Sequence, residues 1–312
     1  MSGRRLRVAT RGSTLARIQT DHVIRLLGEG VEVEPVVVET LGDRRADAPI
    51  WRLGGQGVFV KEVQAAVLDG RADLAVHSAK DLPSAPAGGL VIAAVPERED
   101  PRDALVGAAL DDLPPGGRVA TGSVRRRAQL AWLRPDLTFA GLRGNIETRL
   151  AKAAGHDAVV VAAAALRRLG RDDAAAQVLD TEILVPQVGQ GALAVECRTD
   201  DGEVRDLLAI ADHPPSARAV AAERAYLAEV GGGCDLPVGA HATIDEEGVV
   251  RLTGLLAAPD GRVMIRHTAS GEDGEALGRA VARHLLDEAG GAHLLAAVAL
   301  APADGAGEAG PP

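Results

Sequence analysis

The stretch Leu6-Arg7-Val8-Ala9-Thr10-Arg11-Gly12-Ser13 sets out the unit from which the fold is built. Leu6 to Thr10 predicts a short strand, and Arg11-Gly12-Ser13 predicts a turn into a helix with Ser13 as its N-cap. The apolar residues that follow recur at helical spacing: Leu15, Ile18, Val23, Leu26 and Leu27. Unpaired N–H groups at such a junction can bind an anion, although capping alone would explain the serine.

The same order of elements returns at residues 118–127. Residues 118–121 predict a strand, and Ser123 caps a helix that opens Val124-Arg125-Arg126-Arg127. Arginines in the first turn of a helix oppose its dipole, which costs stability unless an anion lies nearby. The cations that could line one cleft and bind several carboxylates are Arg125, Arg126, Arg143, Arg149 and Arg168. Arg168 alone would be an ordinary charge at a helix C-terminus.

A second polar stretch, His77-Ser78-Ala79-Lys80-Asp81, follows the predicted buried strand Asp73 to Val76. Open α/β sheets place ligands beyond the carboxyl ends of their strands, so these side chains are candidates for a binding site. The alternative is that Lys80 and Asp81 form a solvated pair in a loop.

A third notable stretch is Gly231-Gly232-Gly233-Cys234. Glycines permit a tight turn that could present the thiol of Cys234. The alternative is a small buried side chain, since free cysteine is often buried. Cys197 lies in an apolar strand and is expected to be structural.

Composition excludes several classes of protein. The chain has 312 residues, 46% of them hydrophobic, which is enough for packed cores. A net charge of -10 and only 2% aromatic residues argue against nucleic-acid binding. The two cysteines fit neither a disulfide framework nor a zinc site, and no metal is expected. The sequence shows neither a signal peptide nor an apolar run of membrane-spanning length, so a cytoplasmic location and no membrane partner are expected.

The chain predicts three domains. Residues 1–96 and 193–213 are expected to form the first and 97–192 the second, joined by a charged hinge at residues 96–103 and a glycine-rich return at 185–192. Residues 214–300 are expected to form a small α+β domain, and 301–312 a disordered tail. The expected strands of this α+β domain are Ala240 to Ile244, Val249 to Leu256 and Arg262 to Thr268, and its expected helices are 217–230, 274–289 and 292–300. A helix is also expected over Val58 to Leu68.

Taken together, these motifs closely resemble the porphobilinogen deaminase family from Arg7 to about Leu300. The matching stretches are Ala9 to Ser13, Gly57 to Glu62, Ala75 to Asp81, Arg98 to Asp103, Leu142 to Asn145, Val188 to Ala192 and Gly232 to Cys234. The resemblance implies an α/β fold of two type II periplasmic-binding-protein-like lobes with mixed sheets and a small α+β C-terminal domain. It also implies a monomer.

The resemblance further implies hydroxymethylbilane synthase activity. Cys234 would carry a dipyrromethane cofactor through a thioether, and four porphobilinogen molecules would be deaminated in turn and joined to it. Hydrolysis would then release the linear tetrapyrrole. Each pyrrole carries an acetate and a propionate, which fits arginines concentrated in an acidic chain.

The family's site residues transfer to matching positions here. Asp81 matches the catalytic aspartate, which would stabilise the cation left when ammonia departs. The cofactor-binding positions are Cys234, Ser78, Lys80, Asp81, Thr121, Ser123, Arg125, Arg126 and Gly144. The substrate-binding positions are Arg11, Ser13, Arg143, Arg149, Arg168 and Gln190.

Three positions depart from the family pattern. Gln56 stands where lysine is frequent, Leu41 where arginine is frequent, and Gly122 where a hydroxyl side chain is usual. These departures change loop 42–57, whose closure the resemblance implies, and remove one expected donor to a cofactor carboxylate. The main alternative function is a two-lobed anion-binding, solute-binding or sensor protein, which would leave Cys234 without a role. An RNA-binding protein would need aromatic platforms, which are lacking.

Overall fold

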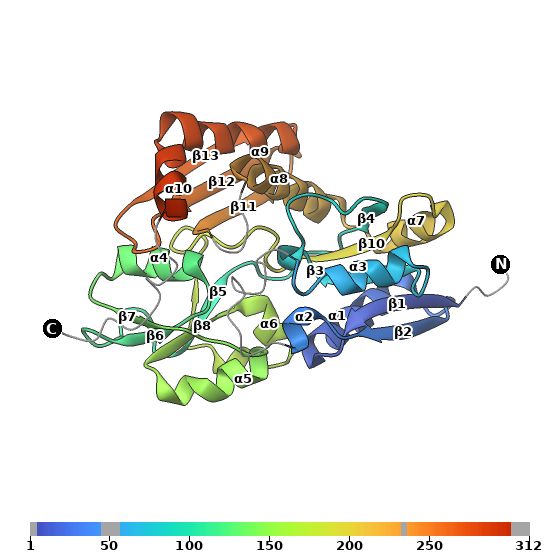
Figure 1. Cartoon of the computed structure of the whole chain (residues 1–312), viewed down its shortest axis with the longest axis horizontal. Coiled ribbons are helices and arrows are strands. Elements are labelled where there is room, and N and C mark those ends of the chain that lie inside the picture. Colours follow the sequence, from blue (N-terminus) through green and yellow to red (C-terminus); the bar gives the residue numbers. More distant parts are fainter. Residues whose placement is uncertain (1–4, 45–56, 232–235, 301–312) are drawn as a thin grey trace.

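The first lobe is built on a mixed five-stranded sheet. The computed structural model describes residues 5–44, 57–231 and 236–300 (Figure 1). The strand order of the first sheet is β2-β1-β3-β10-β4, with β1 parallel to β2 and β3, and β10 antiparallel to β3 and β4. The strands are β1 (Leu6–Arg11), β2 (Val33–Val38), β3 (Leu74–Ser78), β4 (Leu90–Ala94) and β10 (Leu193–Arg198). The helices of this lobe are α1 (Thr14–Leu27), α2 (Leu41–Arg44), α3 (Lys61–Leu68), α7 (Gly202–Leu208) and the 3-10 turns η2 (Ala79–Asp81) and η5 (Ala209–Ala211).

The second lobe repeats this plan. Its sheet has the order β7-β6-β8-β5-β9, with β6 parallel to β7 and β8, and β5 antiparallel to β8 and β9. The strands are β5 (Asp103–Gly107), β6 (Arg118–Ala120), β7 (Thr138–Ala140), β8 (Ala158–Ala162) and β9 (Gln177–Leu179). The helices are α4 (Val124–Leu133), α5 (Ile146–Ala151), α6 (Ala163–Arg168) and the turns η3 (Lys152–Gly155) and η4 (Asp172–Ala174).

Two crossings of the chain connect the lobes. The first leads from β4 into β5, and the second returns from β9 into β10, so each sheet receives one antiparallel strand from a crossing. The crossings are hydrogen-bonded to each other where Glu99 N donates to the Gly191 carbonyl and Gln190 Nε2 donates to the Pro101 carbonyl, at 3.3 and 2.7 Å. Any relative movement of the lobes therefore has to pass through this pair of segments.

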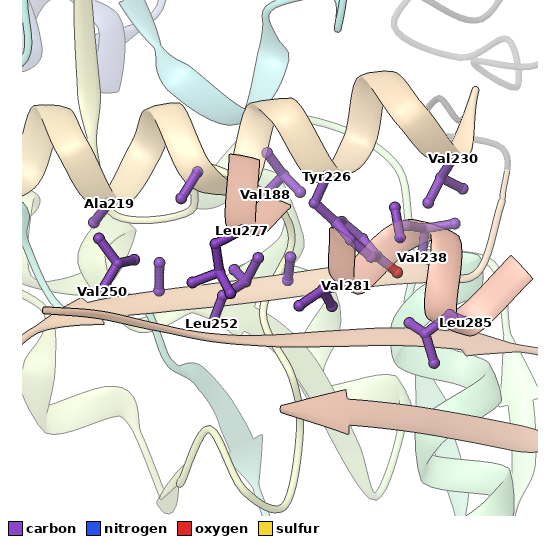
Figure 2. Packing of buried hydrophobic residues seen from close by; sticks show 14 of the residues in the cluster. Val188, Ala219, Tyr226, Val230, Val238, Val250, Leu252, Leu277, Val281 and Leu285 are labelled. Atoms are coloured by element: carbon purple, nitrogen blue, oxygen red, sulfur yellow. The ribbon is translucent and has the colours of Figure 1, made fainter. Parts of the chain in front are cut away.

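The third unit is a three-stranded antiparallel sheet covered by helices. Its strands are β11 (Val238–Ile244), β12 (Val250–Ala257) and β13 (Met264–Gly271), and its helices are α8 (Pro214–Val230), α9 (Gly274–Arg283), the π-helical turn η6 (His284–Glu288) and α10 (Gly291–Leu300). Figure 2 shows Tyr226, Val281 and Leu285 in the core between α8, α9 and the sheet. A separate cluster of Ala128, Val185, Leu255 and Ala257 packs the sheet onto α4 of the second lobe.

A buried carboxylate fastens the third unit to the crossings. Glu223 on α8 has no exposed surface and accepts two hydrogen bonds from the Arg98 guanidinium, at 2.6 and 3.2 Å. It also accepts from the backbone N–H groups of Gly189 and Ala242, at 2.7 and 2.8 Å. One side chain thereby joins both crossings and strand β11, and a buried charge paired in this way is costly to remove.

These sheets confirm the predicted fold class, whereas several element boundaries were wrong. The helix expected from Val58 begins at Lys61, because Gly57 has a φ of +75° and residues 57–60 form a turn. The helix expected over 274–289 changes to a π-helical turn at His284. Strand β9 and helix α7 were not predicted. The tail 301–312 lies outside the described residues.

Candidate functional site

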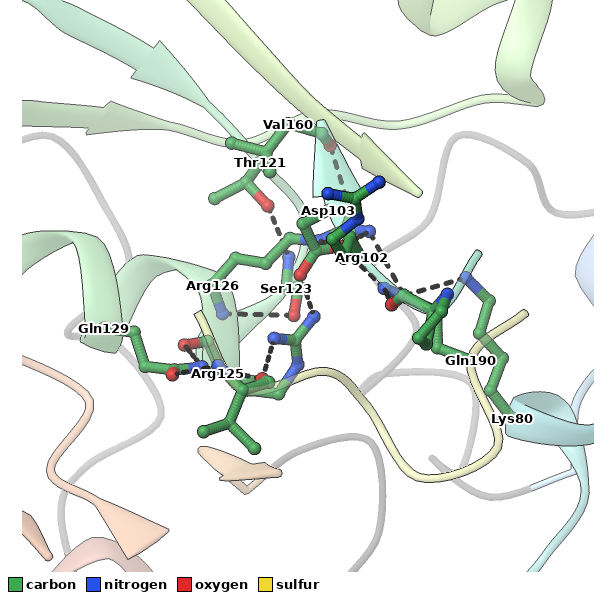
Figure 3. A network of polar contacts seen from close by, with 12 residues as sticks. Lys80, Arg102, Asp103, Thr121, Ser123, Arg125, Arg126, Gln129, Val160 and Gln190 are labelled. Atoms are coloured by element: carbon green, nitrogen blue, oxygen red, sulfur yellow. Dashed lines mark hydrogen bonds and ion pairs between the residues drawn. The ribbon is translucent and has the colours of Figure 1, made fainter. Parts of the chain in front are cut away.

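The site is organised around the carboxylate of Asp103, the first residue of β5, which is 0% exposed. Its Oδ2 accepts from Arg125 Nη2 at 2.7 Å, and its Oδ1 accepts from Arg126 Nε and Nη2 at 3.0 and 2.6 Å (Figure 3). Burial opposes ionisation, but Arg125 and Arg126 together hold the pKa of Asp103 far below its ordinary value. The carboxylate is therefore ionised and bound to two guanidinium groups.

Helix α4 places these arginines at its start. Ser123 is the N-cap, and its Oγ accepts from Arg126 N, while Thr121 Oγ1 accepts from Ser123 N at 3.2 Å. Both guanidinium groups also donate to carbonyls, Arg125 to Val185 and Arg126 to Val160. The anion that the sequence predicted beside this basic helix start includes a carboxylate of the protein itself, Asp103.

Gln190 on the second crossing connects this cluster to the first lobe. Its Nε2 donates to Asp103 Oδ1 at 2.8 Å, and its Oε1 accepts from Lys80 Nζ at 3.4 Å and from Arg126 Nη2 at 3.5 Å. Neighbouring Gly189 has a φ of +71°, and a Cβ there would come within 3.0 Å of the backbone of Ala79 and Lys80. Gly189 lets the second crossing pack directly against η2. As a result Lys80 of the first lobe and Arg126 of the second lobe both donate to the side-chain amide of Gln190.

Lys80 is held in a strongly cationic environment. Burial, and next the positive charge of Arg126, lowers the pKa of Lys80 to about 8. Asp81 and Asp103 act on Lys80 in the opposite sense but do not restore its ordinary pKa. The alternative of a solvated loop pair does not describe Lys80, which hydrogen-bonds to Gln190 inside the cluster.

Arg143 and Arg149 extend the cationic surface within the second lobe. Gly144 has a φ of +109°, which aims its carbonyl at Arg149 Nε, 2.9 Å away. Burial, followed by the charges of Arg126 and Arg143, lowers the pKa of Arg149 to about 10. Burial also lowers the pKa of Arg143. Because Asp81 of the first lobe acts on Arg149 as well, the two lobes face each other here.

Arg168 and Ser78 lie at the adjoining contact between α1 and α6. A small cavity of about 30 Å³ between the lobes is lined in part by Gln19, Ser78, Lys80 and Arg168. Arg168 Nη2 donates to the Gly191 carbonyl at 2.8 Å, and burial lowers the pKa of Arg168 to about 10. Ser78 Oγ accepts from Gln19 Nε2 at 2.9 Å.

Arg11 and Ser13 lie at the end of β1, as the first motif predicted. Ser13 caps α1, and its Oγ accepts from Ala16 N at 3.3 Å. Arg11 is paired with Asp43, with Nη2 to Oδ1 at 2.5 Å, and its guanidinium lies 4.2 Å from the centre of the Phe59 ring. Burial opposes the shift, but the hydrogen bond from Arg11 lowers the pKa of Asp43. Arg11 therefore has an internal carboxylate partner that the sequence did not indicate.

Two of the three departures from the family pattern are visible. Leu41 begins α2, and its backbone N donates to Glu62 Oε1 at 2.9 Å. A Cβ on Gly122 would lie 2.6 Å from the Leu142 carbonyl, so a side chain at this position requires that loop to move. Gln56 and Cys234 both lie outside the described residues.

The described part of the cleft contains more positive than negative charge. Its linked cations are Lys80, Arg125, Arg126, Arg143, Arg149 and Arg168, and the carboxylates that act on them are Asp81, Glu99 and Asp103. Six cations against three carboxylates leave the cleft with a net positive charge. Burial lowers the pKa of Lys80, Arg149 and Arg168, and neighbouring cations lower it further at Lys80 and Arg149, so their charged forms are disfavoured without an anion.

Asp103, Asp43 and Glu223 were missed as partners of the site. The sequence carried one signal for Asp103, an acid that directly follows the Pro101-Arg102 crossing and opens a buried strand. For the part of the chain with described coordinates, no cluster of three or more His, Cys, Asp or Glu side chains could hold a metal ion. Within the same ranges, no helix is both long enough and apolar enough to cross a membrane.

The fold and this site define a class, a two-lobed α/β protein with a cationic cleft suited to a polycarboxylate. Comparison with known families identifies which one. Residues 6–206 match the profile of the porphobilinogen deaminase, dipyromethane cofactor binding domain, and residues 217–287 match that of the porphobilinogen deaminase C-terminal domain. The chain belongs to the porphobilinogen deaminase family.

Individual relatives agree over nearly the whole chain. Porphobilinogen deaminase of Geobacillus kaustophilus is 47% identical over 294 residues, which cover 91% of this chain and 95% of that protein. Porphobilinogen deaminase of Acidothermus cellulolyticus is 47% identical over 304 residues, or 94% of this chain and 91% of that protein. That of Shouchella clausii is 45% identical over 300 residues, with 93% and 96% covered.

Solved structures with similar lobes include two bacterial proteins. Lipoprotein Tp32 from Treponema pallidum has a TM-score of 0.43 and 12% identity, covering 66% of this chain and 90% of that one. A periplasmic binding protein with high arginine specificity from Salmonella typhimurium has a TM-score of 0.38 and 11% identity, covering 69% and 94%. Both scores are low, and the family assignment is based on sequence.

Proposed function

We propose that this chain is a hydroxymethylbilane synthase, a transferase that deaminates four porphobilinogen molecules and joins them head to tail on a covalent dipyrromethane. Membership of the porphobilinogen deaminase family supports the reaction. The observation that carries the proposal at the level of the site is the excess of positive charge in the cleft. Two pyrrole rings carry four carboxylates, which a net positive cleft would neutralise.

The described residues fit the dipyrromethane. Arg125 Nε is buried and has no hydrogen-bond partner among the described residues, so a donor is available to a carboxylate. Two of the five N–H donors of Arg125 are used, by Val185 and Asp103. When bound through Cys234, the dipyrromethane would supply the free pyrrole carbon to which the first new ring is joined, and each later ring would join the one before it. Arg125, Arg126 and Lys80 would neutralise its carboxylates, with Ser78, Thr121, Ser123 and Gly144 shaping their surroundings.

Asp81 is proposed as the catalytic residue. It ends the turn η2, next to Lys80, and acts electrostatically on Arg149 across the cleft. Departure of ammonia from porphobilinogen leaves a cation, and a fixed carboxylate stabilises such a charge and accepts the proton released on bond formation.

The incoming porphobilinogen would bind to other polar and cationic side chains of the two lobes. The proposed substrate positions are Arg11, Ser13, Arg143, Arg149, Arg168 and Gln190. Bidentate pairing of guanidinium with carboxylate orients a ring as well as holding it. Arg11 would exchange Asp43 for a substrate carboxylate or hold both.

The remaining expectations form part of the same proposal. The first domain would consist of residues 1–96 and 193–213, the second of 97–192 and the third of 214–300. The enzyme would act as a cytoplasmic monomer without nucleic-acid or membrane partners. A solute-binding or sensor protein with this cleft would bind porphobilinogen without consuming it.

The test is turnover by purified protein with matched cysteine variants. Wild type should consume porphobilinogen, release ammonia and form a linear tetrapyrrole. Cys197 is buried in the core of the first lobe, so Cys197→Ala controls for loss of a thiol and should retain activity. Cys234→Ala should form no product. Binding without consumption by wild type would favour the solute-binding alternative, and full activity of Cys234→Ala would exclude the tether.

A further inference from the structure

The carboxylate of Asp103 has the wrong sign for a site that binds carboxylates. It is 0% exposed and lies between two guanidinium groups that are themselves 3% and 5% exposed. An acid at this place weakens the attraction of the cleft for an anion, so it needs another reason to be there. That reason lies in its contacts.

Asp103 fixes the positions of both guanidinium groups. Its Oδ2 is committed to Arg125 and its Oδ1 to Arg126, at 2.7 and 2.6 Å. Without an anion between them these two cations would repel each other in a buried place: burial, and to a smaller extent the charge of Arg126, lowers the pKa of Arg125, while Asp103 acts in the opposite sense. The carboxylate offsets this repulsion and holds each planar group in one orientation.

The contacts leave binding capacity on the arginines. Arg126 is used on every nitrogen, by Asp103, Val160 and Gln190. Arg125 keeps three of its five N–H donors, including the buried Nε that has no partner among the described residues. Arg126 and Asp103 thus form a support from which Arg125 can donate to a ligand.

Asp103 also connects this support to the crossings. Gln190 Nε2 donates both to Asp103 Oδ1 and to the Pro101 carbonyl, at 2.8 and 2.7 Å. The same amide accepts from Lys80 of the first lobe. The orientation of the arginine pair is therefore coupled to the contact between the lobes.

We propose that Asp103 is a positioning residue for the covalent primer: it presets Arg125 and Arg126 so that a dipyrromethane can be assembled and held. This inference rests on the proposed function. A 1 Å displacement of a binding group can cost about 100-fold in rate, so loss of this carboxylate should affect priming well beyond its effect on stability.

The first lobe offers a matched control for a purely structural carboxylate. Asp73 is 3% exposed and also meets two arginines, Arg7 at 3.0 Å and Arg198 at 3.5 Å, but it precedes β3 and so lies at the opposite end of that strand from η2. Asp103, in contrast, pairs with Ala162 at the carboxyl end of β8. Asp73→Asn and Asp103→Asn each remove a buried carboxylate that is paired with two arginines, and the arginines of Asp73 are the more exposed ones. Only Asp103→Asn removes it from beside the cleft.

The experiment compares wild type, Asp103→Asn, Asp103→Glu and Asp73→Asn, all purified as full-length folded protein. Circular dichroism and thermal melting report folding, and intact mass reports the fraction that carries two pyrrole units. Asp103→Asn should have a primed fraction, or a priming rate from porphobilinogen, about 10- to 100-fold below wild type. Asp73→Asn should be less stable but primed like wild type. Asp103→Glu, which keeps the charge, should recover part of the priming.

A double-mutant cycle on the priming rate separates a positioning role of Asp103 from a general loss of stability. If Asp103 acts through Arg125, then Asp103→Asn should add little to the priming defect of Arg125→Lys. Additive effects, or normal priming in folded Asp103→Asn, would overturn the proposal. If neither Asp103 variant folds while Asp73→Asn does, the carboxylate serves folding and the positioning role is withdrawn. An unprimed wild type would instead refute the proposed function itself.

Discussion

The low pKa of Lys80 leads to a quantitative prediction about how the primer is acquired. In the primer-free protein, burial and then Arg126 lower the pKa of Lys80 to about 8. A carboxylate bound beside Lys80 would restore the charged form and raise that pKa again. Binding the first pyrrole units therefore requires a protonated Lys80, and this requirement becomes costly above pH 8.

The magnitude follows from the protonated fraction. With a pKa of about 8, that fraction falls from about 90% at pH 7 to about 10% at pH 9, so the priming rate should fall about 10-fold for lack of Lys80 charge. By the same linkage, the unfolded chain binds more protons than the native one between pH 8 and the ordinary lysine pKa. The stability of primer-free protein should therefore rise with pH in that window.

The assay uses primer-free protein, expressed in cells that cannot make porphobilinogen and then mixed with it at pH 7 to 9. Lys80→Arg keeps its charge over this range, so its priming rate should lack the 10-fold decline. Ionisation of the substrate cancels in the ratio of the two rates. The ratio of the wild-type rate to the Lys80→Arg rate should fall about 10-fold from pH 7 to 9. If this ratio stayed constant, the role assigned to Lys80 would be refuted. Lys80→Gln should prime slowly at every pH.

Three other changes test separate parts of the account. Asp81→Asn should lower turnover by about 100- to 1000-fold, the usual cost of losing a preorganised charge, while some molecules still carry the primer. If primed Asp81→Asn reacted at the wild-type rate in a single-turnover assay, Asp81 would have no catalytic role. Glu223→Gln leaves Arg98 without its charge partner and should lower the free energy of unfolding by about 3 kcal/mol or more. The control Glu247→Gln changes an exposed side chain and should have little effect on stability. Equal melting temperatures for the two variants would contradict the fastening role of Glu223. Gly191→Ala would bring a Cβ to 2.2 Å from the Glu99 carbonyl at a φ of +86° and should displace Arg168. The control Gly116→Ala has a φ of +75° and open space around it, so it should cost only about 1 kcal/mol of stability. Similar losses of stability and activity in both variants would show that the protein relieves the clash at Gly191.

Local patterns predicted the repeated elements of the fold well. The strand, turn and helix at Leu6 to Leu27 and at residues 118–133 follow from apolar spacing and serine caps, which act over a few residues. Short strand β9 has only three residues, too few for a period to be recognised. The π-helical turn at His284 continues the apolar spacing of α9, so a single helix was the natural prediction.

The candidate site was predicted in its cations and missed in its anions. The helix-dipole argument required an anion beside Arg125 and Arg126, but Asp103 is about 20 residues away in sequence and reaches them only through sheet pairing. Asp43 reaches Arg11 over 32 residues in the same way. Such partners depend on tertiary contacts that spacing along the chain does not contain.

The intact mass of purified wild-type protein tests the central claim most directly. The account predicts a single species heavier than the chain by two pyrrole units, with the added mass on the peptide that contains Cys234 and none on the peptide that contains Cys197. A protein of unmodified mass that still converts porphobilinogen to tetrapyrrole would contradict the account.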